Sequence, residues 1–206
     1  MAFAFDTGRG RYRDTATGRL VSEGRVRLAV DAVADLASER MADLTERLLS
    51  GEVTLARWQA GMLETIKASH LAAGVAAAGG RAQMTPSQYG FLGSEIRAQY
   101  GYLRTFGAQL AAEAVPLDRR LIARAGMYGQ HARVTYEAVR RRDQAGRGYR
   151  FERNMRHAKE SCGQCVTLSA RGWVEIGTLP PIGSRTCLAR CRCTISYRKA
   201  PVEVAA

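Results

Sequence analysis

All five cysteines of this chain lie in two stretches, Cys162-Gly163-Gln164-Cys165 and Cys187-Leu188-Ala189-Arg190-Cys191-Arg192-Cys193. The 161 residues before them contain none. A C-x2-C pair and a C-x3-C pair, 21 residues apart, can each direct two sulfurs toward one ion from a tight turn. Because four thiolates close the tetrahedral shell of zinc, the pattern predicts a structural Zn²⁺ site rather than a catalytic one.

The predicted zinc ligands are Cys162, Cys165, Cys187 and Cys191, with Cys193 as an alternative to the last of them. A small hairpin between the two pairs would bring them together. In a strand over residues 190–197, positions 191 and 193 point to the same face, so either sulfur could reach the ion. We favour Cys191, because a C-x3-C loop closes more easily than a C-x5-C loop.

Three other uses of these cysteines fit the sequence less well. Disulfides are typical of secreted domains, but no signal peptide is visible and an odd number leaves one thiol over. A redox C-x2-C motif normally accompanies a βαβ unit, and nothing around Cys162 resembles one. A catalytic cysteine acting with His157 would need a third group to orient the histidine, and the sequence suggests none.

The composition is that of a globular protein with a strong positive charge. Hydrophobic residues make up 46% of the 206 residues and charged residues 24%, which fits one ordinary domain with a small appendage. No apolar run reaches the length of a membrane span. The net charge is +12, and all but three of the 31 basic residues are arginines. Such a charge favours nucleic acid or an acidic protein surface as the partner.

A helical body is predicted over residues 23–146, where apolar residues recur every three or four positions in four segments. The first segment is Glu23–Leu49, and the fourth covers residues 117–142. Thr54 and Thr85 are the expected N-caps of the second and third helices, and the third has the further signals of a capping box.

Three further features of this body are two glycine pairs and one histidine. Gly79-Gly80 is expected to end the second helix and to act as a hinge. Gly126 and Gly129 weaken the fourth helix unless they allow another helix to approach closely. His70 ends the apolar stripe of the second helix, so we expect it at the boundary of the core rather than as a metal ligand.

The fourth predicted helix ends in Arg140-Arg141-Arg142, and Arg147 and Arg150 follow within or just after the linker at residues 144–148. These five arginines are the candidate surface for nucleic acid or an acidic partner. Cations are also favourable at a helix C-terminus for electrostatic reasons alone, so a solvated helix end is the alternative.

The residue types change on both sides of the helical body. Residues 1–22 contain two short β-like pieces around the turn Thr17-Gly18, which predicts an extended arm, with a disordered basic tail as the alternative. Residues 147–200 contain the cysteines and short β-prone pieces, which predicts a small zinc-ribbon-like β module, followed by a tail at 201–206. The expected fold class is therefore mainly α, with about four long helices between the arm and the module.

Motifs that would indicate an enzyme are missing from the sequence. It contains no G-x4-GK[ST] phosphate loop, no G-x-G-x-x-G turn, no G-x-S-x-G elbow and no H-E-x-x-H pair. The three histidines lie far apart, and the acidic residues are spread along the helix faces. We therefore expect no enzymatic activity.

A longer pattern runs through the C-terminal region. It consists of His157-x4-Cys162-x2-Cys165, Gly172-Trp173, Leu179-Pro180-x2-Gly183 and Cys187-x3-Cys191-Arg192-Cys193-Thr194-Ile195. This pattern resembles the end of minor head, or head-morphogenesis, proteins of tailed bacteriophages. Residues 50–62 and 11–22 are similar to the start of the helical body and to the opening of proteins in the same group. The common form has a histidine upstream of its C-[RK]-C element, whereas Leu188 stands three positions before Cys191 here.

The resemblance implies a structural component of the phage head, made in few copies in the bacterial host cytoplasm and built into the virion. It implies the portal or the major capsid protein as partner, packaged DNA as a non-specific partner, no membrane, and several copies in a symmetric assembly. The implied role is head assembly or DNA packaging and delivery. The alternative is a zinc-ribbon regulator that binds nucleic acid, which would prefer a specific DNA sequence.

Overall fold

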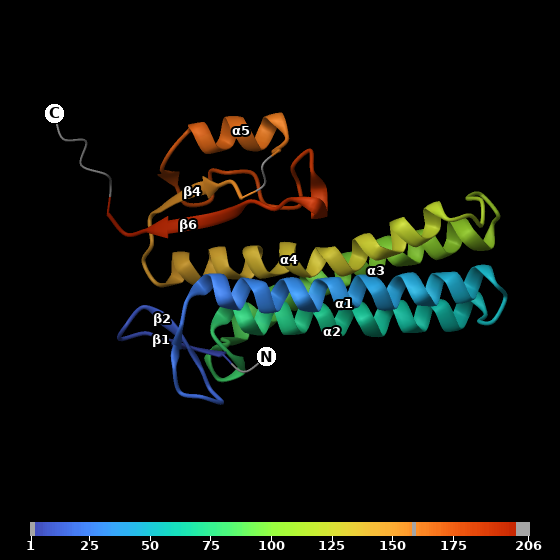
Figure 1. The fold of residues 1–206 in the computed structure, drawn as a ribbon, viewed down its shortest axis with the longest axis horizontal. Coiled ribbons are helices and arrows are strands. Elements are labelled where there is room, and N and C mark those ends of the chain that lie inside the picture. The colour runs from blue at the N-terminus through green and yellow to red at the C-terminus, as the bar shows by residue number, and fades with distance from the viewer. Residues whose placement is uncertain (1–2, 158–159, 201–206) are drawn as a thin grey trace. The chain divides into compact units, whose positions relative to one another are not determined.

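A computed structural model describes residues 3–157 and 160–200, so the predicted tail at 201–206 lies outside the described residues. Most of the described residues are helical, which confirms the prediction of a mainly α chain (Figure 1). The chain divides into two compact units, Met1–Tyr136 and Glu137–Ala206, and the boundary falls inside a helix. We call them the helical unit and the cysteine unit.

The helical unit is built on α1 (Glu23–Leu49), α2 (Leu55–Ala78), α3 (Pro86–Ala111) and the part of α4 (Arg120–Gly146) that precedes residue 137. Helix α2 runs beside α1 and also beside α3 (Figure 1). A short 3₁₀ turn, η1 (Arg81–Gln83), joins α2 to α3.

Side-chain caps begin the first three helices. Thr54 and Thr85 each accept a hydrogen bond from a backbone amide three residues further on, as the sequence predicted. The Gln88 side chain in turn accepts from the Thr85 amide at 2.8 Å, which completes the capping box. Ser22 caps α1 in the same way. These bonds satisfy amides that have no partner within their own helix.

The core of the helical unit is formed by the apolar stripes of its helices. Trp58 is fully buried and packs edge-on against Phe106, with ring centroids 5.5 Å apart. Its indole N–H donates to Thr45 Oγ1 at 3.0 Å, so the one polar atom of the ring is satisfied. The other members of this cluster are Met41, Val53, Met62, Ile66, Leu103, Leu110, Leu121, Ala125 and Tyr128.

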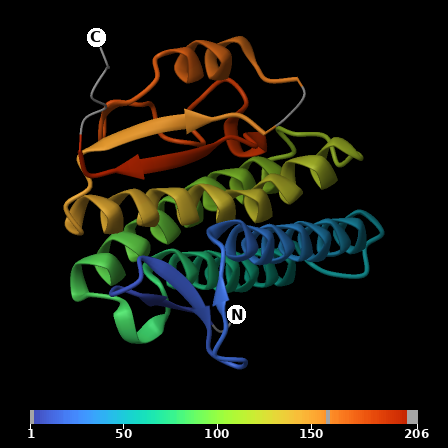
Figure 2. The ribbon, with the colours of Figure 1, turned by 60° about the vertical axis from the view of Figure 1, so that its left-hand side comes forward.

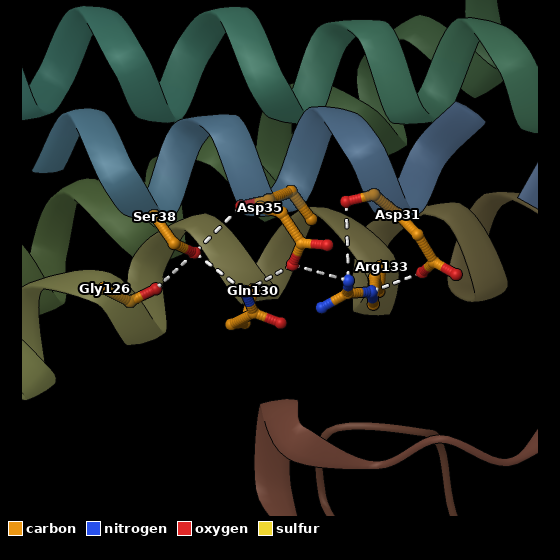
Figure 3. Close-up of polar contacts among 7 residues, drawn as sticks. Asp31, Asp35, Ser38, Gly126, Gln130 and Arg133 are labelled. Carbon is orange, nitrogen blue, oxygen red and sulfur yellow. Dashed lines mark hydrogen bonds and ion pairs between the residues drawn. The ribbon is translucent and has the colours of Figure 1, made fainter. Parts of the chain in front are cut away.

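Helices α1 and α4 approach closely at Ser38, and glycine in α4 makes this possible. A Cβ atom on Gly129 would lie 2.4 Å from the backbone nitrogen of Ser38, which is too close for any real side chain. Ser38 Oγ donates to the carbonyl of Gly126 at 2.9 Å and accepts from Gln130 Nε2 at 2.8 Å (Figure 3). Gly129 therefore allows α1 and α4 to approach each other closely.

An ion-pair network continues along the same two helices. Arg133 of α4 is buried, and its guanidinium donates to the carboxylate of Asp31 and, at 2.8 Å, to Asp35 Oδ1 (Figure 3). A third bond from Arg133 reaches the Asp31 carbonyl at 3.4 Å. The two acids of α1 thus supply the negative charge that a buried guanidinium requires.

The N-terminal arm is folded. Strands β1 (Phe3–Asp6), β2 (Arg11–Asp14) and β3 (Leu20–Val21) form an antiparallel sheet in the order β1-β2-β3 (Figure 2). The two pieces expected around Thr17-Gly18 are β2 and β3, whereas β1 was not predicted. Tyr12 is buried, and its hydroxyl donates to the carbonyl of Ala77 at 3.3 Å, so the sheet is tied to the end of α2.

The double glycine after α2 is a packed turn. Gly79 ends the helix in the left-handed region, at φ 91°, as the sequence predicted for a terminator. Its carbonyl accepts from the amide of Phe5 at 3.0 Å, and a Cβ on Gly80 would lie 2.7 Å from the carbonyl oxygen of Phe3. Strand β1 therefore packs against both residues, and the hinge expected here stays a prediction.

The cysteine unit holds a second antiparallel sheet. Its strands are β4 (Phe151–Met155), β5 (Val174–Glu175) and β6 (Thr194–Arg198), in the order β5-β4-β6. Helix α5 (Gly163–Ala170) and the 3₁₀ turn η2 (Leu188–Arg190) complete the unit (Figure 1). The region between the cysteine pairs was expected to be a hairpin, but it contains α5 and only the two-residue strand β5. Strand β6 also begins later than the predicted residue 190.

Candidate metal centre

The first cysteine pair lies at the start of α5. Cys162 is the N-cap residue of this helix, and Cys165 follows in its first turn. The amide of Val166 donates to the Cys162 carbonyl at 3.1 Å, which begins the helical hydrogen bonding. Free amides at a helix N-terminus favour negative charge, so this position suits thiolate sulfurs.

The second pair is held by the turn η2. The amide of Arg190 donates to the Cys187 carbonyl at 3.0 Å, and the amide of Cys191 donates to the Leu188 carbonyl at 3.2 Å. Leu188 has φ 48°, a left-handed conformation that a bulky residue rarely adopts. The tight turn keeps Cys187 and Cys191 together, while Cys193 lies just beyond it, one residue before β6.

The structure brings all five predicted cysteines together. The Cys165 sulfur lies 3.7 Å from that of Cys187 and 3.8 Å from that of Cys191. The sulfurs form two groups of three that share Cys165: Cys162, Cys165 and Cys187, and Cys165, Cys191 and Cys193, with all distances inside each group within 4.8 Å. This cluster could hold a metal ion.

The sulfur spacing fits thiolates around an ion rather than disulfides. All five cysteines are free. A disulfide would need sulfurs about 2.0 Å apart. Four sulfurs at about 2.3 Å from a central ion are about 3.8 Å from one another in a regular tetrahedron. The two distances from Cys165 match the second value.

The protonation of the cysteine sulfurs depends on whether a cation is bound. Burial, followed by the neighbouring thiol of Cys191, raises the pKa of Cys187. Burial and the charges of Cys191 and Cys165 raise the pKa of Cys193 to about 12. Burial and crowding therefore favour the protonated form of Cys187 and Cys193, whereas a bound cation stabilises the thiolate form of its ligands.

Two buried polar residues beside the cysteines were not predicted from the sequence. Asn154 of β4 donates from Nδ2 to the carbonyl of Cys165 at 3.2 Å. Its Oδ1 accepts from NH1 of Arg185 at 2.7 Å, and that nitrogen lies 4.0 Å from the Cys165 sulfur. Neither residue stands in a recognisable motif, so no sequence signal could have found them.

The histidines take no part in the cysteine groups of the described residues. His157 is exposed, and its Nε2 lies 2.8 Å from Thr194 Oγ1. His70 belongs to the helical unit and is only 1% exposed, so its expected position at the core boundary was wrong. Its Nδ1 lies 2.7 Å from Thr135 Oγ1, and burial lowers its pKa to about 4.

The five arginines of the predicted basic surface occupy different environments. Arg140 is 6% exposed, and its guanidinium lies 5.3 Å from the centre of the Tyr197 ring. Arg141 donates to the buried carboxylate of Glu152 through two nitrogens, at 2.8 and 2.6 Å. These two side chains make contacts inside the cysteine unit. The prediction that all five arginines form one exposed surface was therefore wrong.

The other three arginines are more accessible. Arg147 is half-buried and pairs with Asp143 at 2.6 Å, four residues earlier on α4. Arg142 and Arg150 are exposed. The remaining exposed basic side chains described in this unit are Arg153, Arg156, Arg171, Arg190, Arg192 and Lys199.

No protein-family model, curated protein or solved structure matches this chain. Within the described residues, every helix is too short or too polar to cross a membrane.

Proposed function

We propose that the cysteine cluster binds one Zn²⁺ ion through Cys162, Cys165, Cys187 and Cys191. The spacing of sulfurs around Cys165, 3.7 and 3.8 Å, carries this proposal because it is that of a tetrahedral thiolate shell. Cys187 lies beside the other three ligands. Binding would draw Cys162 and Cys191 toward each other, and Cys193 would remain a neighbouring thiol.

Zinc fits this donor set better than harder cations. Soft thiolates select zinc over magnesium or calcium, which prefer oxygen ligands. Four thiolates leave no open coordination position, so the ion would be structural. The cysteine unit has few large apolar residues in its interior, mainly Leu168, Leu179, Ile182 and Ile195. Structural zinc contributes about 10–16 kcal/mol of apparent binding energy in small peptides, more than so small a core supplies.

Metal analysis of the full chain tests the zinc proposal. We expect one zinc per chain in the wild type, loss of zinc in Cys162→Ser, Cys165→Ser and Cys187→Ser, and retention in the matched control Cys193→Ser. The first three variants should unfold the cysteine unit, while circular dichroism still reports the helices. A chain without zinc whose cysteines are joined in disulfides, as seen by mass spectrometry, would contradict the proposal.

We infer further that the protein is a minor head component of a tailed bacteriophage, acting at the portal or the capsid in head assembly or DNA delivery. Support comes from the C-terminal pattern behind the resemblance. Its cysteines lie in one cluster, and the carbonyl of Pro180, from the same pattern, accepts a hydrogen bond from Arg185 at 3.0 Å. Residues that are far apart in the pattern thus serve one site.

The charge of the cysteine unit supports an acidic partner or packaged DNA. The unit contains 14 of the 31 basic residues of the chain but only 6 of its 19 acidic residues, in about a third of the length. Its exposed arginines carry guanidinium groups, whose planar shape suits phosphates and carboxylates.

Co-purification tests the assignment to the phage head. The tagged full chain, expressed with candidate portal and major capsid proteins, should be recovered in particles or in a complex with one of them. A chain that stays free of both, and that selects one DNA sequence from a random pool, would favour the regulator alternative instead.

A further inference from the structure

Arg185 is almost completely buried beside the cysteine cluster, with 1% of its surface exposed. Its Nε donates to the carbonyl of Pro180 at 3.0 Å, and NH1 donates to Asn154 Oδ1 at 2.7 Å. The remaining nitrogen, NH2, is also buried and has no hydrogen-bond partner among the described residues. The guanidinium is therefore held in position through Nε and NH1, while both N–H donors of NH2 are unused.

Within the part of the chain that the structure describes, no carboxylate balances this buried charge, because Arg185 forms no ion pair with an acidic side chain there. The fully buried acid of the unit, Glu152, is already paired with Arg141. An unpaired buried cation is unfavourable because it loses its hydration without gaining a counter-charge. The nearest group that can become negative is the sulfur of Cys165, 4.0 Å from NH1.

Metal binding would create the missing negative charge. Four thiolates and one divalent ion together carry a net charge of −2. We propose that Arg185 is the counter-cation of the metal-loaded cysteine cluster, positioned to offset the charge of the thiolates and to donate from NH1 to the Cys165 sulfur. The inference rests on the proposed metal site and extends it to a residue that is not a ligand.

Asn154 orients the guanidinium of Arg185 and does not neutralise its charge. This side chain is fully buried, accepts from Arg185 through Oδ1 and donates through Nδ2 to the Cys165 carbonyl at 3.2 Å. It therefore links the arginine to the helix turn that carries a ligand. Because an amide is neutral, it orients Arg185 without neutralising it, whereas an aspartate at this position would compete with the thiolates.

The test measures the zinc affinity of the full chain by competition with a chelator of known affinity. Arg185→Met removes the charge and should weaken zinc binding by about 10- to 100-fold, the range seen for residues that support metal ligands. Arg185→Lys keeps the charge and should recover part of this loss. Arg171→Met removes an exposed arginine at the far end of α5 from the cysteines and should leave the affinity unchanged.

A second pair of variants separates charge from packing and applies even if Arg185→Met fails to fold. Asn154→Ala and Asn154→Asp both lose the hydrogen bond to Cys165, but only the aspartate adds a negative charge. We expect weaker zinc binding in Asn154→Asp than in Asn154→Ala. Equal affinities for this pair, or for Arg185→Met and the wild type, would overturn the inference while leaving the metal site intact. A wild-type chain that binds no zinc would instead overturn the proposed function.

Discussion

The guanidinium of Arg141 and the carboxylate of Glu152 form a two-pronged ion pair inside the cysteine unit. Nε lies 2.8 Å from Oε2, and NH2 lies 2.6 Å from Oε1. The carboxylate also accepts from the amides of Gly177 and Leu179, at 3.1 and 2.9 Å, and NH2 of Arg141 donates to the Leu179 carbonyl at 2.7 Å. The end of α4, strand β4 and the loop after β5 are thus joined at one buried point.

Removing one member of this pair should strongly destabilise the cysteine unit. Arg141→Met leaves the fully buried Glu152 without its cation, and breaking a buried pair in this way costs about 3–5 kcal/mol. Chemical denaturation followed by the fluorescence of Trp173, which lies in this unit, would report the change. The control is Arg153→Met, an exposed neighbour on β4, which should change stability by less than about 0.5 kcal/mol.

The double variant Arg141→Met/Glu152→Leu gives a sharper test of the same pair. It removes both charges, so it should recover part of the stability lost in Arg141→Met. If the single and double variants are equally unstable, the loss comes from packing rather than from an uncompensated carboxylate.

Glycine in α4 should be required at one position and dispensable three residues away. Gly129→Ala places a Cβ against the Ser38 backbone, so we expect a loss of about 1–3 kcal/mol from overpacking. Gly126→Ala has its nearest contact at 3.9 Å, so the alanine should stabilise the helix by about 0.5–1 kcal/mol. Thermal unfolding of the two variants measures the contrast, and equal effects would contradict the close approach of α1 and α4.

Acidification should weaken the helical unit through His70. Burial lowers its pKa from 6.5 to about 4, so the unfolded chain binds more protons than the folded one between these values. Its stabilising contribution is therefore complete above about pH 6.5 and falls away as the pH drops toward 4, by roughly 3 kcal/mol in total.

Denaturation of His70→Gln at several pH values tests this prediction. The variant should lose the larger part of the pH dependence that the wild type shows in this window, because burial also lowers the pKa of His131 and leaves a smaller contribution of the same sign. His157→Gln, at an exposed histidine, should retain the full dependence. A wild type whose stability is flat between pH 6.5 and 4 would show that His70 binds its proton equally in the folded and unfolded chain, so that burial does not lower its pKa.

If packaged DNA is a partner, exposed arginines of the cysteine unit should contribute to DNA affinity whatever the sequence of the duplex. Replacing Arg150 and Arg153 by glutamine should lower affinity equally for two unrelated duplexes. The slope of log K against log salt should become less steep by about 0.9 for each phosphate that the protein no longer neutralises. Filter binding over a salt series measures both quantities. Arg97→Gln, at an exposed arginine of α3 in the helical unit, is the control and should change neither of them.

Several features of the fold could be predicted because they depend on residues close together in the chain. Thr54 and Thr85 begin their helices because a cap contacts an amide only three residues away. Gly79 ends α2 because a left-handed residue suits glycine wherever the helix lies. The short cysteine pairs likewise predicted a cluster of sulfurs that could hold a metal ion, since each pair is held by a single local turn.

Other predictions were wrong because the environment of a side chain depends on residues that lie in distant segments of the sequence. Arg140 and Arg141 were predicted to lie on a basic surface, because nothing nearby in sequence shows that Glu152 is buried against Arg141 or that Arg140 lies over the Tyr197 ring. His70 was predicted to lie at the boundary of the core because the apolar stripe of α2 gives no indication of its partner, Thr135, which lies on α4.

The sequence by itself determined the helix periods, the caps, the positive charge and the grouping of five cysteines, because these follow from local geometry and composition. Only the tertiary structure decided which buried charges meet. It placed Glu152 against Arg141 and Arg185 against Asn154 and the Cys165 sulfur. Such pairs form between segments joined by loops, and the energy of a buried charge depends on the whole surrounding interior rather than on its neighbours in the chain.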